Sequence, residues 1–130
     1  MEKYILLVED NPVAVRVAKI LFERLNCKVD VAQDGEMAIE MATKHHYDAI
    51  SMDIGLPLKN GVEACIAIRQ YEHDHPELAP VPIIAVSANT GMEEREQYLA
   101  SGMQGVIAKP FTEKQAMEFL SLCNAICKAA

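Results

Sequence analysis

The sequence predicts an α/β fold in which five parallel strands alternate with five helices. Short apolar runs typical of strands alternate with longer segments whose apolar residues recur with the 3.6-residue helical period. Short turns join these segments, and this regular alternation is typical of parallel sheets with helices on both faces. With 130 residues, 51% of them apolar, the chain has the length and composition of one compact domain.

The first half of the chain contains three of the predicted strands. Tyr4–Val8 is a short apolar run that ends in acids, and Asn11 followed by Pro12 is typical of the start of a helix. Apolar residues then recur at helical spacing from Val13 to Leu25. The alternation continues as strand, helix, strand and helix over Val29–Ala32, Glu36–Lys44, Ala49–Met52 and Val62–Tyr71.

The second half completes the pattern with two strands and two helices. Val81–Ser87 is the most hydrophobic strand, and a loop over residues 73–80 precedes it. A helix over Met92–Ala100 is stopped by Gly102, and a short strand follows at Val106–Ala108. The last helix begins at about Glu113, and its apolar stripe consists of Ala116, Phe119, Leu120, Cys123 and Cys127.

Charge, hydropathy and cysteine spacing argue against several function classes. The 12 basic and 19 acidic residues give a net charge of −7, without a basic cluster that could follow a phosphate backbone, so we expect no direct nucleic-acid binding. No apolar run approaches the ~20 residues of a membrane helix, and the N-terminus lacks the features of a secretory signal. Cys27, Cys65, Cys123 and Cys127 show no CxxC spacing, so we expect reduced, buried thiols in a cytoplasmic protein.

Five polar residues lie at the ends of the predicted strands. Glu9 and Asp10 come directly after the first strand, and Asp53 follows the third. Ser87 ends the fourth strand, and Lys109 follows the fifth. The carboxyl ends of parallel strands meet at one edge of the sheet. We therefore expect three acids, a hydroxyl and an amine to share one site.

The chemistry of this set favours phosphoryl transfer. Three carboxylates repel each other unless a cation lies among them, and a hard ion such as Mg²⁺ (or Mn²⁺) suits few carboxylates together with phosphate oxygens. Lys109 and Ser87 can donate to phosphoryl oxygens. Asp53 is the candidate nucleophile, forming an aspartyl phosphate, because it stands alone after a buried strand whereas Glu9 and Asp10 are adjacent.

Each of these residues also has a simpler interpretation. Asp10 or Asn11 could only cap the following helix, and Asp53 could be only a turn residue. Ser87 could be a loop hydroxyl and Lys109 a solvated charge. These alternatives stay open for each residue alone, but their occurrence together after successive strands favours the functional interpretation.

The chain resembles the response-regulator receiver domains of two-component phosphorelay systems from about Tyr4 to Leu122. The matching segments are ILLVEDNPVAVRVAKILFERL, YDAISMDIGLP followed by NGVEACIAIR, VPIIAVSAN and SGMQGVIAKPF. Each segment alone is a weak signal, but together they are specific. The resemblance implies a flavodoxin-like, doubly wound sheet with strand order 2-1-3-4-5, and one receiver domain over residues 1–130 with a core at about 4–122.

The resemblance also implies a role for each polar residue. Asp53 would be the phosphoacceptor and a metal ligand, with Asp10 bound directly to the metal and Glu9 bound through water. Ser87 would be a switch hydroxyl that moves toward the phosphoryl group, and Lys109 would bind a phosphoryl oxygen. Further implied features are the Gly55 carbonyl as a metal ligand, the backbone N–H groups of Ile54 and Ala88 as phosphate ligands, and a cis peptide bond before Pro110.

The resemblance further implies a place in signalling. The VEDN start, the apolar first helix and the MDIGLP turn are most similar to receivers of hybrid sensor histidine kinases, rather than to those of transcription factors. The implied partner is a histidine kinase or a histidine phosphotransfer domain, with self-catalysed phosphoryl transfer and autodephosphorylation. Val13, Val15, Val17 and Phe22 give the first helix extra apolar surface, which suits either partner docking or ordinary burial.

Two positions depart from the pattern of the family. Receivers commonly have Tyr, Phe or His three residues before the lysine, where this chain has Val106, and often an acid where it has Gly105. The departure predicts a conformational signal that is smaller or differently routed, with Val106 or backbone shifts filling the space that Ser87 leaves.

Two other function classes are weaker alternatives. A phosphatase that uses an aspartyl phosphate usually needs a second acid two residues after the nucleophile, where this chain has Gly55. A receiver-like interaction module that works without phosphorylation is disfavoured because all five key positions are filled. Other features suggest no site, since we expect solvated His45–His46 and His73/His75 pairs and a core filled in part by Met92, Met103 and Met117.

Overall fold

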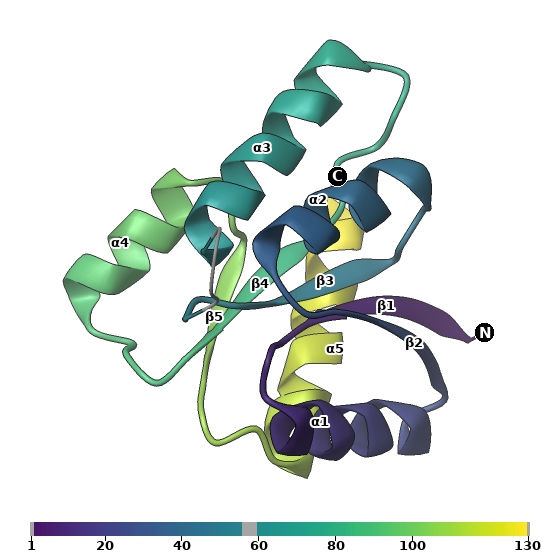
Figure 1. Ribbon diagram of the computed structural model, residues 1–130, viewed down its shortest axis with the longest axis vertical. Coiled ribbons are helices and arrows are strands. Elements are labelled where there is room, and N and C mark those ends of the chain that lie inside the picture. Colours follow the sequence, from purple (N-terminus) through teal and green to yellow (C-terminus); the bar gives the residue numbers. More distant parts are fainter. Residues whose placement is uncertain (1, 56–59, 130) are drawn as a thin grey trace.

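The computed structural model describes residues 2–55 and 60–129, with the side chains of 128 and 129 left undescribed. Within these residues, five strands alternate with five helices (Figure 1). The strands are β1 (Lys3–Val8), β2 (Cys27–Ala32), β3 (Ala49–Asp53), β4 (Ile83–Ser87) and β5 (Gly105–Ala108). The helices are α1 (Pro12–Arg24), α2 (Gly35–Lys44), α3 (Gly61–Asp74), α4 (Met92–Ala100) and α5 (Glu113–Ala129).

The strands form one parallel sheet in the order β2-β1-β3-β4-β5, which confirms the predicted flavodoxin-like topology. The order reverses direction at β1, where the chain leaves toward β2 on one side and later returns to β3 on the other. The register places Asp53 beside Val86 and Ser87 beside Ala108. The carboxyl ends of β3, β4 and β5 therefore lie side by side.

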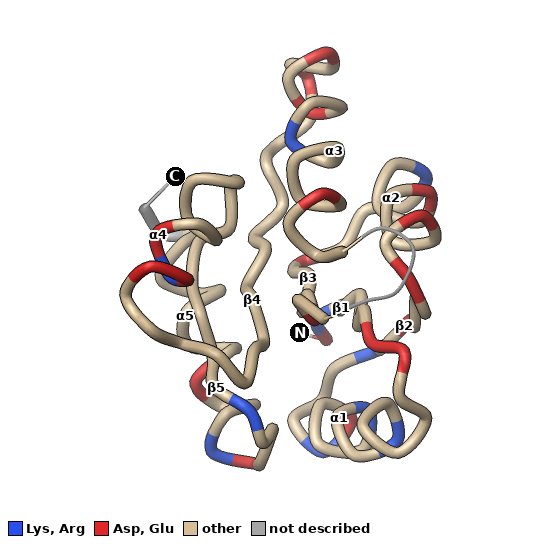
Figure 2. Tube along the Cα trace, turned by 60° about the vertical axis from the view of Figure 1, so that its left-hand side comes forward, with Lys and Arg blue, Asp and Glu red and all other residues tan. Residues whose placement is uncertain are grey.

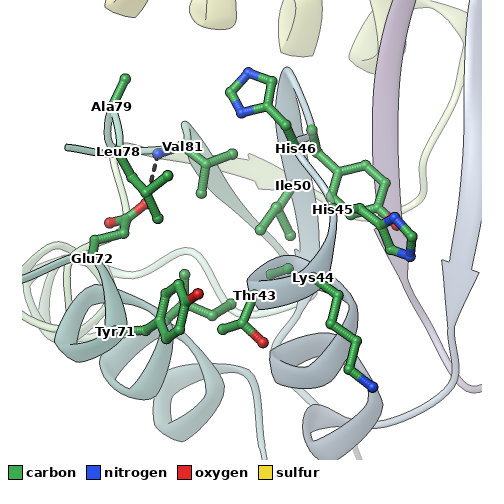
Figure 3. Close-up of a pocket in the computed structure, with 13 residues that line it drawn as sticks. Thr43, Lys44, His45, His46, Ile50, Tyr71, Glu72, Leu78, Ala79 and Val81 are labelled. Atoms are coloured by element: carbon green, nitrogen blue, oxygen red, sulfur yellow. Dashed lines mark hydrogen bonds between the residues drawn. The ribbon is translucent and has the colours of Figure 1, made fainter. Parts of the chain in front are cut away.

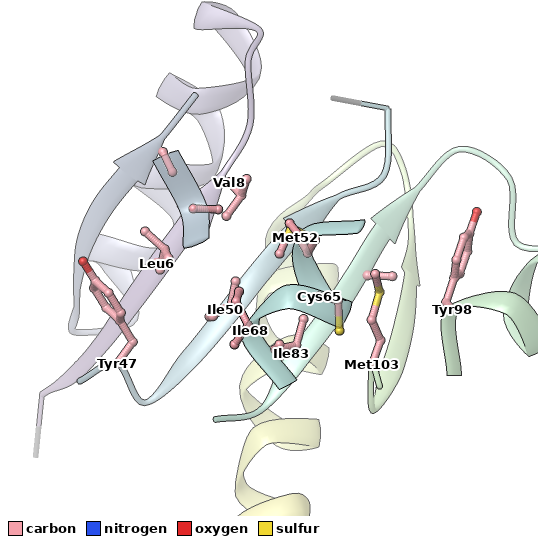
Figure 4. Packing of buried hydrophobic residues seen from close by; sticks show 14 of the residues in the cluster. Leu6, Val8, Tyr47, Ile50, Met52, Cys65, Ile68, Ile83, Tyr98 and Met103 are labelled. Atoms are coloured by element: carbon pink, nitrogen blue, oxygen red, sulfur yellow. The ribbon is translucent and has the colours of Figure 1, made fainter. Parts of the chain in front are cut away.

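Helices cover both faces of the sheet (Figure 1), and each face carries its own core. Helices α1 and α5 cover one face, where Phe22 packs edge-on against Phe119 with ring centroids 5.1 Å apart. Helices α2, α3 and α4 cover the other face, and Figure 4 shows the side chains that fill it, including Ile68 of α3 and Tyr98 of α4. Each fully buried side chain of this size contributes about 1.5–3 kcal/mol to folding.

Side chains cap the helices that follow β1, β2 and the loop after β3. The Asn11 side chain accepts hydrogen bonds from the backbone N–H groups of Val13 and Ala14, at 2.9 and 3.1 Å. Asp34 and Asn60 cap α2 and α3 in the same way. Such caps stabilise a helix by roughly 1 kcal/mol. Because Asn11 caps α1, Asp10 is not needed for that purpose.

Three element boundaries differ by two or three residues from those predicted from the sequence. Strand β2 begins at Cys27 because its first residue pairs with Lys3 of β1. Strand β4 begins at Ile83, since the Val81 N–H donates to the Glu72 side chain and the next residue is a proline without an N–H. Helix α3 continues to Asp74, two residues into the predicted loop.

Several residues that were predicted to be buried are exposed. Met92 and Met117 are 79% and 56% exposed, so only Met103 of the three methionines fills the core. Cys127 is also exposed, whereas the other three cysteine thiols are buried. All four cysteines have helical or strand-edge positions in the sequence pattern. The pattern alone does not show where the contact between helix and sheet ends.

The charged residues are distributed over several elements, with both signs on the helices (Figure 2). Acids outnumber basic residues over the whole chain, which has a net charge of −7. Among the residues that the structure describes, no helix is both long enough and apolar enough to span a bilayer.

Candidate functional site

The ends of β1, β3 and β5 bring a lysine and two acids into direct contact. The Lys109 Nζ atom lies 2.9 Å from Asp53 Oδ1 and 3.7 Å from Glu9 Oε1. Glu9 and Asp53 are buried, with 7% and 5% of their surface exposed, whereas Asp10 is exposed. The predicted convergence of these four residues at one sheet edge is confirmed.

Backbone N–H groups of two turns fix the orientation of the acids. Glu9 Oε2 accepts hydrogen bonds from the N–H groups of Asp10 and Asn11, at 3.0 and 3.3 Å. Asp53 Oδ1 accepts one from the Gly55 N–H at 3.2 Å. Asp53 is therefore a turn residue, as one simpler interpretation held, but the same oxygen also binds Lys109.

A close backbone approach holds the end of β3 against the start of α3. A Cβ atom at Gly61 would lie 2.6 Å from the Asp53 carbonyl oxygen, which is closer than real Cβ contacts allow. Glycine is therefore required at position 61 for this packing. The contact places the first turn of α3 directly behind Asp53.

The site holds more negative charge than its lysine neutralises. Burial, together with the hydrogen bond to Asp53 and the Asp53 charge, raises the pKa of the Glu9 carboxyl to about 7. Burial by itself lowers the pKa of the Lys109 ammonium, but the hydrogen bond and charge of Asp53, with Glu9 and Asp10, outweigh it and the pKa is raised. The lysine is therefore firmly charged, and a second cation would relieve the remaining repulsion.

The donor set fits a hard divalent cation. Glu9, Asp10 and Asp53 each offer a carboxylate oxygen, and these oxygens lie within 4.8 Å of one another. Oxygen ligands of this number and charge suit Mg²⁺ or Mn²⁺, which retain waters and bind only one or a few carboxylates. Gly55 lines the same cleft, and the role predicted for its carbonyl stays a prediction.

Ser87 ends β4 with its side chain held on the side of α4. Its hydroxyl lies 3.0 Å from the Asn89 carbonyl oxygen and accepts a hydrogen bond from the Asn89 N–H, also at 3.0 Å. It also lies 3.1 Å from the Tyr98 hydroxyl of α4. Tyr98 is not predicted from the sequence, because α4 is largely polar and carries no apolar stripe that would mark its single buried residue.

The remaining predicted phosphate ligands, Ile54 and Ala88, both line the cleft. The Ile54 N–H donates to the Val86 carbonyl oxygen across a long 3.4 Å, so it already has a partner. Ala88 lines the cleft beside Ser87. The Lys109–Pro110 peptide bond is cis, as the resemblance implied. The phosphate-binding roles of Ile54 and Ala88 stay predictions.

One side of the cleft is apolar. The cleft has a volume of about 870 Å³ and extends from the acids to α1 and Phe111. Val13 and Val17 line it and are 71% and 43% exposed, and Ile20 continues the same face at 46%. Phe22, by contrast, is fully buried, so ordinary burial explains that residue.

A second, smaller cavity of about 260 Å³ lies near the amino ends of β3 and β4 (Figure 3). His45, His46 and Tyr71 line it, and Figure 3 shows the Glu72 carboxylate bound to the Val81 N–H. The other Glu72 oxygen pairs with Arg69 at 2.7 Å. The only acid among the lining residues is thus already satisfied, and the cavity gathers no reactive set.

The model of the family described as "Response regulator receiver domain" matches residues 5–121. The chain is a response regulator receiver domain. The receiver is 34% identical over 84% of its length to the transcription factor SKN7 of Saccharomyces cerevisiae, and 33% identical over 95% to hybrid signal transduction histidine kinase I of Dictyostelium discoideum. It spans only 17% and 7% of the lengths of these two relatives.

A solved receiver structure has the same fold and holds a metal in its own active-site cleft. The receiver domain of sensor histidine kinase PA1611 from Pseudomonas aeruginosa PAO1 is 38% identical, with a TM-score of 0.81 over 93% of this chain and 96% of that one. A magnesium ion is coordinated in the active-site cleft of that protein. Sensor kinases are thus among the relatives of this receiver.

Proposed function

We propose that this receiver takes a phosphoryl group from a phosphohistidine onto Asp53 in a Mg²⁺-dependent reaction and relays it or signals with it. The observation that carries the proposal is the contact of the buried Asp53 carboxylate with the Lys109 ammonium, next to Glu9 and Asp10. A buried carboxylate that is paired with one fixed cation and lies among other acids has the charge arrangement expected of an acceptor for a phosphoryl group.

The proposed metal ligands are the carboxylates of Asp10 and Asp53 and the Gly55 carbonyl, with Glu9 acting through water. Bound Mg²⁺ (or Mn²⁺) would neutralise charge on the transferring phosphoryl oxygens. The three carboxylates lie close together, and among the described residues Lys109 is the only side-chain cation in contact with them. This excess of negative charge supports the assignment.

In the proposed transfer, an Asp53 carboxylate oxygen forms a bond to phosphorus. The bond between phosphorus and the histidine nitrogen breaks, its electron pair stays on the imidazole, and that ring regains a proton from solvent. Lys109 and the Ser87 hydroxyl would donate to the phosphoryl oxygens, together with the N–H groups of Ile54 and Ala88. The long Ile54 hydrogen bond to Val86 is a weak competitor for such a donor.

Loss of the phosphoryl group would follow by attack of water on phosphorus, with release of the Asp53 carboxylate and inorganic phosphate. Gly55 and Asn89 line the cleft on either side of Asp53 and Ser87. An added Cβ at Gly55 would meet no atom of the described residues within 4 Å, which supports access of water from this side.

The proposed partner is a histidine kinase or a histidine phosphotransfer domain that docks on α1. The exposed face formed by Val13, Val17 and Ile20, the α1 apolar face, adjoins the acidic end of the cleft. A partner helix with its phosphohistidine could bury this face while its reactive group enters the cleft. Relatives among histidine kinases support this class of partner.

The chain would act as one receiver domain, with its core at about residues 4–122. We propose that it belongs to a hybrid sensor histidine kinase or another phosphorelay, since such a kinase is among the relatives and the solved neighbour comes from a sensor kinase. The four unpaired cysteine thiols support a reducing, cytoplasmic setting.

Incubation with acetyl phosphate and Mg²⁺, followed by intact-protein mass measurement, tests the proposal. We expect one added phosphoryl group on the wild type and none on Asp53→Asn or on wild type with the metal chelated. An unmodified wild type would contradict the proposal and favour an interaction module that works without phosphorylation. Turnover of a phosphate ester by the chain would favour the phosphatase alternative.

The docking surface has its own test with a matched control. Val13→Asp should slow transfer from a phosphorylated histidine phosphotransfer domain that phosphorylates the wild type, while phosphorylation by acetyl phosphate is retained. Ile66→Asp introduces the same charge at a residue of α3 that is 52% exposed and should transfer normally. Equal transfer rates for both variants would exclude docking on the α1 apolar face.

A further inference from the structure

Three polar groups compete for two protons beside the proposed acceptor. The Ser87 hydroxyl lies 3.0 Å from the Asn89 carbonyl oxygen, and the Tyr98 hydroxyl lies 3.1 Å from both of them. Each hydroxyl carries one proton, and the carbonyl carries none. Only one of the two hydroxyls needs to donate to Asn89, so the other proton is available elsewhere.

The proposed reaction changes which hydroxyl donates to the Asn89 carbonyl oxygen. When Ser87 donates its proton to a phosphoryl oxygen, it can no longer donate to the Asn89 carbonyl. Without another donor, that acceptor would lose its protein hydrogen bond, which opposes the change. The Tyr98 hydroxyl donates to the same carbonyl at 3.1 Å, so it can satisfy this acceptor in place of Ser87.

Burial fixes Tyr98 in this position. Its side chain is 3% exposed, Ser87 is 6% exposed, and the contact between their hydroxyls is buried. Figure 4 shows the ring extending from α4 beside the sheet, as a member of the core on that face. Tyr98 also lines the cleft that contains Asp53 and Lys109.

We propose that Tyr98 is a positioning residue for phosphorylation, whose hydroxyl takes over the Asn89 carbonyl when Ser87 turns to the phosphoryl group. This inference rests on the proposed phosphorylation of Asp53. Tyr98 belongs to α4, so the exchange of hydrogen bonds ties the state of the phosphoryl site to that helix.

A double-mutant cycle tests the role with the rate of phosphorylation by acetyl phosphate and Mg²⁺ as its readout. Tyr98→Phe keeps the ring and removes only the hydroxyl, so we expect the rate to fall about 2- to 10-fold, the range for one hydrogen bond. In a Ser87→Ala background, Tyr98→Phe should have no further effect, since no serine proton remains to be released. Tyr47→Phe, which removes a hydroxyl bound to Asp30 at the other end of the sheet, should leave the rate unchanged.

A spectroscopic readout on the unmutated site keeps the test independent of the stability of Tyr98→Phe. The chain contains four tyrosines, and Tyr98 is the one that contacts Ser87. With 3-fluorotyrosine incorporated, the ¹⁹F resonance that Ser87→Ala displaces should also shift on phosphorylation of the Ser87 protein, and should not shift in Asp53→Asn.

The outcomes separate this inference from the proposed function. If the wild type is not phosphorylated, the proposed function fails. If it is phosphorylated but Tyr98→Phe reacts at the wild-type rate, the positioning role is wrong. An equal loss of rate in the Ser87→Ala background, or a Tyr98 resonance that does not respond to phosphorylation, would overturn it as well.

Discussion

The acids at the two ends of the sheet have different kinds of partners. Near the amino ends of β1 and β3, Asp30 accepts hydrogen bonds from the hydroxyls of Tyr4 and Tyr47, the latter at 2.8 Å. Asp48 accepts one from the Tyr4 N–H at 2.7 Å. At the carboxyl edge, Glu9 and Asp53 face each other with Lys109 between them. Neutral hydroxyl and backbone N–H donors bind the first group, whereas the second group also contacts the charged Lys109 ammonium.

The pKa shifts express this difference. The hydrogen bond from Tyr4 lowers the pKa of the Asp30 carboxyl, and Tyr47 lowers it further, so the ionised form is stabilised where it lies. Burial and the neighbouring Asp53 raise the pKa of the Glu9 carboxyl to about 7. An acid that is satisfied by the fold serves stability, and an acid held under repulsion is arranged for a ligand that brings positive charge.

Removal of Lys109 should have the largest effect on the carboxyl edge. We expect Lys109→Met to slow phosphorylation by acetyl phosphate at least ~100-fold, because a preorganised donor to the transferring group is lost. The rate of appearance of phosphorylated protein measures it. Lys28→Met is the matched control, since Lys28 lies over the Tyr4 ring in the other region and should leave the rate unchanged. A Lys109→Met rate within about threefold of wild type would contradict the proposed difference between the two ends of the sheet.

Loss of one carboxylate at the same edge should weaken the binding of the metal. We expect Asp10→Asn to lower Mg²⁺ affinity roughly tenfold or more, because the ligand set loses one charge. Isothermal titration calorimetry measures the dissociation constant. Asp48→Asn removes an acid from the amino-end region and should bind Mg²⁺ like the wild type. Unchanged affinity in Asp10→Asn would remove Asp10 from the ligand set.

The amino-end acid should affect stability and not phosphorylation. Asp30→Asn replaces the carboxylate that accepts from two tyrosine hydroxyls, and we expect the free energy of unfolding to fall by about 1 kcal/mol, because Asp30 is partly exposed. Urea denaturation measures the loss. The phosphorylation rate should match that of the wild type, and a slower rate would show that the two regions are coupled.

The pH dependence of that loss follows from the sign of the shift. The pKa of Asp30 is lowered in the folded protein, so its stabilisation is fully present above the unfolded value of about 4. It disappears as the pH falls through the lower, folded pKa, where the protonated aspartate resembles the asparagine. The difference between wild type and Asp30→Asn should therefore be constant from pH 7 to about pH 5 and vanish in strong acid. A difference that persists there would assign the effect to packing.

The sequence predicted the carboxyl edge better than the amino-end region, for a physical reason. Glu9 and Lys109 directly follow strands and Asp53 is the last residue of one, so parallel pairing alone brings them together. Asp30 and Tyr47 come from the middle of β2 and from a loop, and their contact depends on how α2 and β3 are joined. No periodicity in the chain specifies that geometry.

The Tyr98 contact could not be predicted for a related reason. The rotation of α4 against the sheet decides which side chain meets Ser87, and this mostly polar helix has no apolar stripe that would fix its rotation. The expectation that Val106 would have to compensate for a moving Ser87 considered only β5. Val106 is buried at 8% exposure, but the aromatic side chain in contact with Ser87 comes from α4.

Chemical mapping can identify the residue that accepts the phosphoryl group. Borohydride reduces an aspartyl phosphate to homoserine, so wild-type protein treated with acetyl phosphate and Mg²⁺ and then reduced should carry homoserine at position 53. Peptide mass analysis identifies the position. We expect conversion of Asp53 and of no other acid, with Glu9 and Asp10 unchanged. Homoserine at another aspartate, or none after phosphodonor treatment, would contradict it.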